Sequence, residues 1–396
     1  MQPLKGLTVV ALEHAIAAPF ATRQLADLGA RVIKIERPGS GDFARGYDSR
    51  VRGLSSHFVW VNRSKESLTL DLKQPPAAHL LRRLVIETAD VLVQNLAPGA
   101  AARLGLGYEV LSVAKPGLIV CDISGYGDDP ARPGPMRDKK AYDLLIQAEA
   151  GLLSTTGTPE APSKTGIAVA DIAAGMHACN QILAALLQRG QTGRGQRIDI
   201  SMLEALTEWC GHPLYYAIDG AEPPQRTAAR HATIFPYGPF TAGDGTEVML
   251  GVQNEREWAL FCEQVLQQPS LADDPRFSSN PKRLAGRALL QSIIAAAFQP
   301  LTGSELLARL DAAQIANARV NTMHQVWQHP QLQARERWRE VDSPAGPLPA
   351  LLPPGSWSES ARMDAVPALG EHTDAILQEL GCDAAEIAVL RAAGAV

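Results

Sequence analysis

The first 36 residues constrain the fold more than any other part of the sequence, because their pattern changes from strand to helix and back. The apolar, β-branched run at 7–12 predicts a strand, residues 19–28 are compatible with a helix, and residues 30–36 predict a second strand. This order favours a doubly wound, parallel sheet. We therefore expect an α/β fold that binds its ligand at the carboxyl ends of the strands.

The turn after the first predicted strand bears on the kind of ligand. Residues 13–19 lack the GxGxxG pattern that brings a dinucleotide pyrophosphate onto the start of a helix. The missing motif argues against an NAD-dependent enzyme, which is an alternative from a different functional class. A ligand at this turn must be bound in another way.

The same alternation continues through the first half of the chain. Leucines that alternate within 62–73 predict an edge strand, a helix is expected at 77–88, and strands are expected at 90–95 and 118–123. Polar or basic residues occupy the turns that leave these strands. A ligand cleft in an α/β sheet requires such turns.

The length of 396 residues and a hydrophobic content of 46% predict two domains. A Pro- and Ala-rich connector at 220–230 is followed by a predicted hairpin at 237–252 and by a mainly helical region at 255–325. We expect a large domain made of 1–200 and 330–396, a linker at 201–229 and a small domain at 230–329.

The charge and cysteine content exclude several classes of partner. A net charge of -5, with both signs mixed along the chain, gives no electrostatic reason to expect nucleic acid or an anionic membrane as a partner. The five cysteines form no CxxC or metal-binding pattern and are expected to be buried, reduced thiols. We expect a cytoplasmic protein with no metal site, no membrane span and no tightly bound cofactor.

The stretch 166–178 holds the strongest catalytic candidate, Asp171. A short apolar run ends at this carboxylate, and small residues then lead into a helix that is expected to end near Gly190. The first turn of a helix stabilises an anion through its free N–H groups. The alternative is that Asp171 only caps the helix. Asp143 lies in the first turn of another predicted helix, at 139–148, where the alternative is a solvated charged face.

Seven motifs in register identify a family resemblance that covers nearly the whole chain. The sequence resembles the class III CoA-transferase family, also called the CaiB/BaiF family, at Ala30–Asp42, Asn62–Lys65, Asn95–Gly99, Ile123–Gly127, Ala141–Leu144, Thr192–Arg197 and Leu369–Asp374. The resemblance implies an interlocked homodimer, a Rossmann-like large domain made from both chain ends, and an inserted smaller α+β domain. It also implies acyl-CoA and small carboxylic acids as substrates.

The resemblance assigns roles to individual residues. Asp171 matches the nucleophile of the family, which carries CoA as an aspartyl-CoA thioester, and Tyr142 and Asp143 match a pair beside it. The positions that match the CoA site are Ile16, Ala17, Arg37, Leu70, Lys73, Asn95, Leu96, Arg103 and Lys140. The cations among them are expected to face the phosphates of CoA.

The substrate acids follow partly by elimination. Ile16 and the segment 251–254 depart from the oxalate-using branch of the family, so we expect succinyl-CoA as donor and itaconate, mesaconate or citramalate as acceptor. A second carboxylate needs a partner, for which Arg45, Arg52 and His231 are candidates, the alternative being solvated loop charges.

Two alternative functions remain at this stage. An α-methylacyl-CoA racemase of the same fold would use a His/Asp pair. Tyr142 stands at the His position here, and His177 does not obviously replace it. A non-catalytic nucleotide-binding protein is disfavoured by Asp171 itself.

Overall fold

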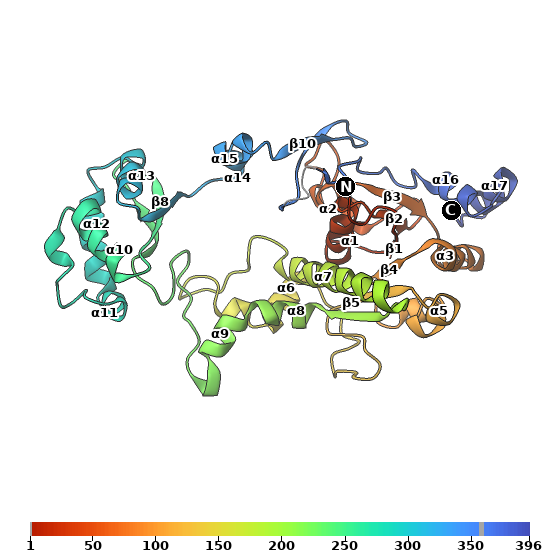
Figure 1. Ribbon diagram of the computed structural model, residues 1–396, viewed down its shortest axis with the longest axis horizontal. Helices are drawn as coiled ribbons and strands as arrows, with labels where there is room; N and C mark the ends of the chain where they lie inside the picture. The colour runs from red at the N-terminus through yellow and green to blue at the C-terminus, as the bar shows by residue number, and fades with distance from the viewer. Residues whose placement is uncertain (1, 356–359) are drawn as a thin grey trace. The chain divides into compact units, whose positions relative to one another are not determined.

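The structure is a computed structural model that describes residues 2–355 and 360–396 (Figure 1). The chain divides into two compact units, each with its own hydrophobic core. The first unit comprises Met1–Leu152, Thr165–Gly211 and Gln331–Val396, and the second comprises Leu153–Lys164 and His212–Pro330. The first unit is therefore built from both ends of the chain.

The first unit is organised around a six-stranded parallel sheet with the order β3-β2-β1-β4-β5-β6. Its strands are β1 (Thr8–Leu12), β2 (Arg31–Glu36), β3 (Lys65–Thr69), β4 (Val91–Gln94), β5 (Ile119–Ser124) and β6 (Arg197–Ser201). This is the Rossmann strand order, and the direction of the order reverses between β1 and β4. Ligands of such sheets bind at that reversal, outside the carboxyl ends of the strands.

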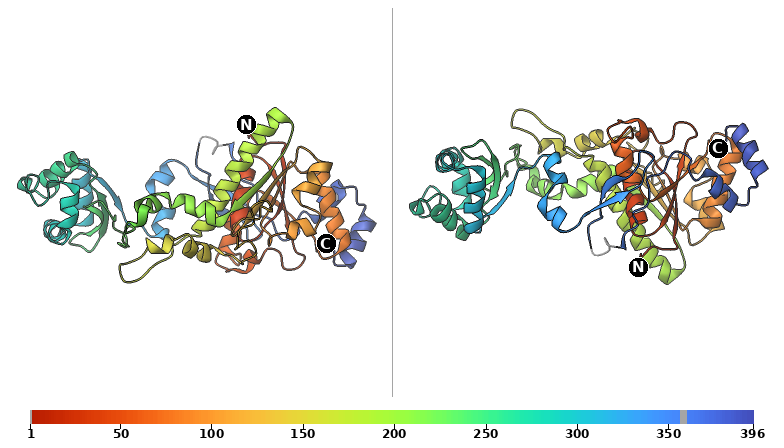
Figure 2. Two further views of the ribbon diagram at one scale, coloured as in Figure 1. Left: turned by 90° about the horizontal axis from the view of Figure 1, so that it is seen from below. Right: turned by 90° about the horizontal axis from the view of Figure 1, so that it is seen from above.

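Helices cover both faces of the sheet, because successive side chains of a strand point to opposite faces. Val9 and Ala11 pack in the core with α1 and α7, whereas Val10 and Leu12 pack in the core with α3, α5, α16 and α17. In Figure 2 the blue C-terminal helices lie beside the orange α3 and α5. The helices of this unit are α1 (Ala17–Asp27), α2 (Ser56–Asn62), α3 (Pro75–Thr88), α4 (Ala100–Arg103), α5 (Tyr108–Ala114), α6 (Asp143–Glu149), α7 (Val169–Thr192), α8 (Met202–Trp209), α16 (Thr373–Glu379) and α17 (Ala384–Ala392).

The second unit is built around an antiparallel sheet with the order β7-β8-β9. Its strands are β7 (Tyr237–Thr241), β8 (Glu247–Gly251) and β9 (Ala316–Arg319). Its helices are α10 (Glu255–Leu260), α11 (Asn280–Ala285), α12 (Arg287–Phe298), α13 (Gly303–Ala312) and α14 (Met323–Trp327). Trp258, Phe261 and Phe298 lie in its core.

Short elements complete the description of the chain. The β10–β11 pair belongs to the first unit, while α9 and α15 lie where the chain passes between the units. These elements are η1 (Phe43–Gly46), η2 (Leu152–Ser154), α9 (Gly211–Tyr216), η3 (Ile218–Gly220), η4 (Phe261–Val265), η5 (Pro269–Leu271), α15 (Pro330–Ala334), β10 (Trp338–Val341) and β11 (Leu348–Leu351).

The α/β fold with a parallel sheet is confirmed, as are the edge strand β3 and the β7–β8 hairpin. The predicted end of the long helix near Gly190 was wrong, because α7 continues to Thr192 and ends at Gly193, whose φ is 70°. Strand β9 was not expected, since its sequence lacks β-branched residues. The units differ from the predicted domain boundaries in placing 201–211 in the first unit and 153–164 in the second.

Helix α7 is, by length and composition, apolar enough to cross a membrane, and it is the one such helix in the described part of the chain. In the structure it packs on α1 and the sheet through small side chains, among them Ala170, Ala174 and Ala178. A buried central helix of an α/β fold has the same composition.

Candidate active site

Asp171 lies in the first turn of α7 and does not cap that helix. The N-cap position is Ala168, whose side chain makes no capping hydrogen bond. The cap comes instead from α6: Oδ1 of Asp143 accepts hydrogen bonds from the backbone N–H of Ala170 at 2.8 Å and of Asp171 at 3.4 Å. The alternative that Asp171 is only a cap was therefore wrong, and Asp143 carries out the capping that was considered for Asp171.

The start of α1 lies against the same turn of α7, because small residues let the two helices approach closely. A Cβ added to Gly175 would be 2.7 Å from the carbonyl oxygen of Ala17 and 3.0 Å from the ring of Phe20. The backbone amide of Ala17 acts on the Asp171 carboxylate and lowers its pKa. Asp171 thus lies beside the first turn of α1, whose N–H groups favour an anion, whereas the N–H groups of Ala170 and Asp171 in α7 are already bonded to Asp143.

The surroundings of Asp171 shift its acidity in a direction that suits chemistry near neutral pH. Loss of hydration on burial raises the pKa of Asp171 to about 7, the negative charge of Asp143 adds to this, and the hydrogen bond from Ala17 opposes it. Both oxygens of Asp143 have protein partners, since Oδ2 accepts a hydrogen bond of 2.7 Å from Gln147. Asp143 therefore acts here through its charge and its helix cap.

We expect Gly175→Ala to lower both the stability and the activity of the protein. Alanine is favoured over glycine inside a helix by about 1 kcal/mol. Here that gain is outweighed, because overpacking against backbone that cannot move aside costs about 1–3 kcal/mol. The start of α1 would also move away from Asp171. Thermal unfolding and kcat of the variant test this, with Gly190→Ala in the exposed half of α7 as a control that should be neutral or stabilising. A stable, fully active Gly175→Ala would contradict the packing described here.

The residues predicted to line the CoA site lie at the carboxyl ends of the strands. Each follows a strand or belongs to a helix entered from that edge: Ile16 and Ala17 follow β1, Arg37 follows β2, Leu70 and Lys73 follow β3, Asn95 and Leu96 follow β4, Arg103 ends α4, and Lys140 precedes α6. In a parallel sheet these ends share one edge. The fold therefore brings together residues that are 124 positions apart in the sequence, from Ile16 to Lys140.

Within this set, exposed cations and buried side chains have different roles. Arg37, Lys73, Arg103 and Lys140 are exposed and form no ion pair among the described residues. The side chains of Ile16, Ala17 and Leu70 are buried, so their backbone is what can meet a ligand. Asn95 is joined to the first loop, because its side chain both accepts from and donates to the backbone of His14 at 2.9 Å.

Tyr47 is a neighbour of the candidate nucleophile that the sequence analysis missed. Burial raises the pKa of Tyr47 to about 12, and the charges of Asp42, Asp171 and Tyr142 act in the same direction. Its phenol is thus a hydrogen-bond donor at neutral pH. Tyr142 itself is 65% exposed and immediately precedes α6. The sequence around Tyr47 carries no local signal of this position.

For two of the three cations predicted to bind a second substrate carboxylate, Arg45 and His231, the structure shows that the prediction was wrong. Arg45 is held by both oxygens of Glu36, at 2.8 and 2.7 Å, and lies 3.7 Å over the Phe58 ring, so it stabilises the fold. His231 belongs to the second unit, and burial lowers its pKa, with nearby His212 and Arg287 contributing. Its Nδ1 accepts a backbone N–H, so it is not the cation that was predicted.

For Arg52, binding of the second substrate carboxylate stays a prediction. Its side chain is exposed and donates one hydrogen bond, of 2.9 Å, to the backbone carbonyl of Pro347. A guanidinium has five N–H donors, so this contact leaves most of them available to an anion.

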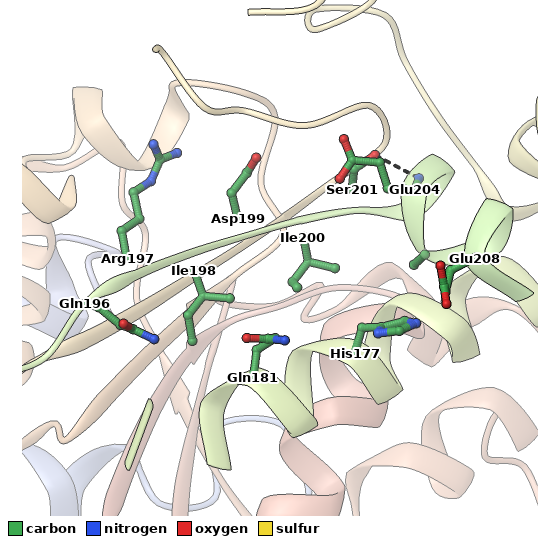
Figure 3. A pocket seen from close by; sticks show the side chains of 11 residues that line it. His177, Gln181, Gln196, Arg197, Ile198, Asp199, Ile200, Ser201, Glu204 and Glu208 are labelled. Carbon is green, nitrogen blue, oxygen red and sulfur yellow. Dashed lines mark hydrogen bonds between the residues drawn. The ribbon is translucent and has the colours of Figure 1, made fainter. Parts of the chain in front are cut away.

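A cavity of about 540 Å³ lies on the outer side of the edge strand β6 (Figure 3). Residues of α7, β6 and α8 line it, including His177 and Gln181 from α7 and Glu204 and Glu208 from α8. Asp171 and the predicted CoA-site residues are not among its lining residues. No group of three or more His, Cys, Asp or Glu residues able to hold a metal ion occurs within 2–355 and 360–396.

The chain is similar to known proteins over nearly its whole length. A family model described as CoA-transferase family III matches residues 4–373. The chain is 33% identical over 385 residues to succinyl-CoA:glutarate CoA-transferase of Mus musculus, covering 96% of this chain and 87% of that protein. It is 32% identical over 394 residues to succinyl-CoA:mesaconate CoA-transferase of Haloarcula marismortui, covering 97% and 98%. The solved structure of a CAIB/BAIF family protein from Brucella suis matches with a TM-score of 0.82 and 34% identity, covering 96% of this chain and 99% of that one.

Proposed function

Because the chain belongs to CoA-transferase family III, we propose that it moves CoA from succinyl-CoA to a short dicarboxylate through a thioester on Asp171. One observation carries the assignment of the nucleophile. A carboxylate with a pKa of about 7 lies between the first turns of α1 and α7, at the edge of the sheet where ligands bind.

The proposed reaction proceeds by four acyl substitutions that conserve the thioester energy. The Asp171 carboxylate attacks the carbonyl carbon of succinyl-CoA, and the CoA thiolate leaves to give a mixed anhydride. The thiolate then attacks the aspartyl carbonyl, which releases succinate and leaves aspartyl-CoA. The acceptor carboxylate attacks aspartyl-CoA and expels the thiolate again, and the thiolate takes the acceptor acyl group from the second anhydride. The Asp171 carboxylate is regenerated.

The elements around Asp171 suit these steps. Each attack creates negative charge on a carbonyl oxygen, and the N–H groups at the start of α1 are donors that need no reorganisation to meet it. Water must be excluded, because hydrolysis of the anhydride or of the thioester would dissipate the energy. Tyr47 interacts electrostatically with both Asp171 and Tyr142, and the rings of these two tyrosines are available to shield the Asp171 carboxylate from water.

Acyl-CoA is proposed to bind along the residues at the carboxyl edge, with its phosphates facing Arg37, Lys73 and Lys140. Replacing one of these cations by Ala should raise KM for acyl-CoA more than it lowers kcat, because a remote phosphate contact stabilises ground and transition states alike. A pantetheine thioester has no nucleotide phosphates, so its kcat/KM should barely change. Lys5→Ala, an exposed lysine before β1 at the opposite edge of the sheet, is the control. An equal loss with both thioesters would contradict the assignment.

The proposed acids are a small dicarboxylate pair, with itaconate, mesaconate or citramalate as acceptor. Support comes from two similar proteins whose names specify succinyl-CoA with glutarate and with mesaconate. A second carboxylate needs a cation or several donors when it is buried, and Arg52 retains free donors.

A screen of acceptors with succinyl-CoA as donor tests this assignment. We expect dicarboxylates to be preferred over monocarboxylates of equal length by about tenfold or more, the effect of one charge-assisted contact. Arg52→Ala should reduce this preference and leave the rates with monocarboxylates unchanged. If butyrate serves as well as mesaconate, whose main chain has the same length, the proposal of a dicarboxylate site fails while the transferase assignment stands.

The proposal extends to assembly and location. We propose an interlocked homodimer in which the second unit forms an inserted smaller domain, as the family resemblance implies. The five free, buried cysteines suit a reducing compartment, and we propose the cytoplasm. Size-exclusion chromatography with light scattering tests the dimer, and a monomer at micromolar concentration would refute it.

A further inference from the structure

A cluster of buried charges lies beneath the loop that leads from β1 into α1. Glu13, Lys34 and Asp42 are fully buried, and Lys65 and Glu36 are nearly so. They come from the end of β1, from β2 and β3, and from the loop after β2. Burying ionised groups is unfavourable unless each is paired, and apolar residues of similar volume are often at least as stabilising. Stability alone therefore does not account for this cluster, which leaves a role in fixing the conformation of the loop between β1 and α1.

The contacts of this cluster form a chain from the sheet to the loop. Lys65 donates to Oε1 of Glu13 at 2.6 Å and to the carbonyl oxygen of Pro19 at 3.0 Å. Lys34 donates to Oδ2 of Asp42 at 2.8 Å and lies 3.4 Å from Oε1 of Glu13. Burial acts to raise the pKa of Asp42, but Lys34 and several hydrogen bonds outweigh it and hold the pKa well below its usual range. Asp42 is therefore ionised.

The other oxygen of Asp42 holds the loop itself. Oδ1 accepts hydrogen bonds from the backbone N–H of Ala15 at 3.1 Å and of Ala44 at 2.9 Å. Ala15 has a φ of 59°, in the left-handed region that residues other than glycine rarely adopt. Such a conformation persists only where the surroundings determine it strongly. The residue before Ala15, His14, is fixed by Asn95.

The loop that Asp42 fixes leads into α1, whose first turn lies beside the proposed nucleophile Asp171. Two residues after Ala15, the chain enters α1 at Ala17, whose carbonyl oxygen lies against Gly175 of α7 and whose backbone amide lowers the pKa of Asp171 one turn earlier in that helix. The direction in which α1 begins is set by the left-handed turn at Ala15. We propose that Asp42 is a positioning residue for the transferase reaction, which fixes Ala15 through a hydrogen bond and thereby aims the Ala17 amide at Asp171. This inference rests on the proposed role of Asp171.

Asp42→Ala should give a pH effect that mere destabilisation does not give. If the turn at Ala15 relaxes, the Ala17 amide moves away from Asp171 and no longer lowers its pKa, so the acid limb of kcat/KM should move to higher pH by about one unit. If Asp42→Ala acted on Asp171 only through the lost negative charge, the acid limb would move to lower pH. The direction of the shift therefore separates this cause from displacement of the Ala17 amide. Of the groups that face Asp171 electrostatically, Asp143 is unchanged in the variant, and Tyr47 loses only the contribution of Asp42 to a pKa that burial mainly raises, so its phenol stays protonated.

Two further variants isolate the cause. Asp27→Ala removes another buried carboxylate, which pairs with Arg23 and Arg63 at the far end of α1, and it should leave the limb in place. Ala15→Val leaves every buried charge intact but disfavours the left-handed turn, so it should shift the limb as Asp42→Ala does. This second route keeps the test open if Asp42→Ala does not fold.

The experiment is the pH dependence of kcat/KM for succinyl-CoA in wild type and these variants, with circular dichroism as a check of folding. The expected result is an upward shift in Asp42→Ala and Ala15→Val and no shift in Asp27→Ala. An unmoved or lowered limb in folded Asp42→Ala or Ala15→Val overturns the inference, as does an equal shift in Asp27→Ala. A wild type without an acid limb near pH 7 would instead count against the proposed role of Asp171.

Discussion

Asp171→Ala is expected to abolish CoA transfer, by about 10⁴-fold or more in kcat, because the side chain is a reactant and not only a binding group. The fold should survive, since the side chain is only partly buried and its helix is capped by Asp143. Rates with succinyl-CoA and an acceptor acid, together with thermal unfolding, measure both effects. A folded variant that retains a tenth of the wild-type rate would exclude Asp171 as the nucleophile.

The isosteric variant Asp171→Asn sharpens the control. A carboxyl group whose folded pKa is raised to about 7 stabilises the fold only while it is protonated, and this contribution is lost as pH rises through that value. Asparagine does not titrate. The variant should therefore gain stability over wild type between about pH 4 and 7, reaching about 2 kcal/mol at pH 8 after a discount for its partly exposed position. An inactive protein that is more stable than wild type is the expected signature.

Activity should depend strongly on pH for the same reason. The attacking form is the carboxylate, so kcat/KM should fall about tenfold per pH unit below the pKa of about 7. Asp143→Asn removes the like charge and should move this limb to lower pH, while its amide oxygen can still accept from Ala170. Glu149→Gln, at the other end of α6, is the control. A limb that moves upward in Asp143→Asn would show that its helix cap matters more than its charge.

The sequence predicted the sheet because strands of a buried parallel sheet are continuous apolar runs, as in 118–123 and 30–36. The resemblance to the CaiB/BaiF family is confirmed. The sequence analysis predicted Asp171 and Asp143 as site residues, but it did not predict that Asp143 caps the helix that carries Asp171. Which of two carboxylates caps α7 depends on a contact between residues 27 positions apart, and local pattern carries no information on such a contact.

The misassigned cations show a limit of the same kind. Arg45 and Arg52 look alike in the sequence, since both are basic residues in the loop after Asp42. Only the fold reveals that Arg45 meets the buried Glu36 and the Phe58 ring, whereas Arg52 points to a single carbonyl. Charge in a loop predicts a cation but not its partner. Tyr47 was missed because nothing in its local pattern indicates that the chain folds back to Asp171.

The proposed covalent mechanism is tested most directly by mass spectrometry of the protein after incubation with succinyl-CoA alone. The account predicts a CoA adduct, linked as a thioester, on the peptide that contains Asp171, its removal by an acceptor dicarboxylate, and its absence from Asp171→Ala. An active wild-type enzyme that shows no adduct under these conditions, together with sequential kinetics, would contradict it.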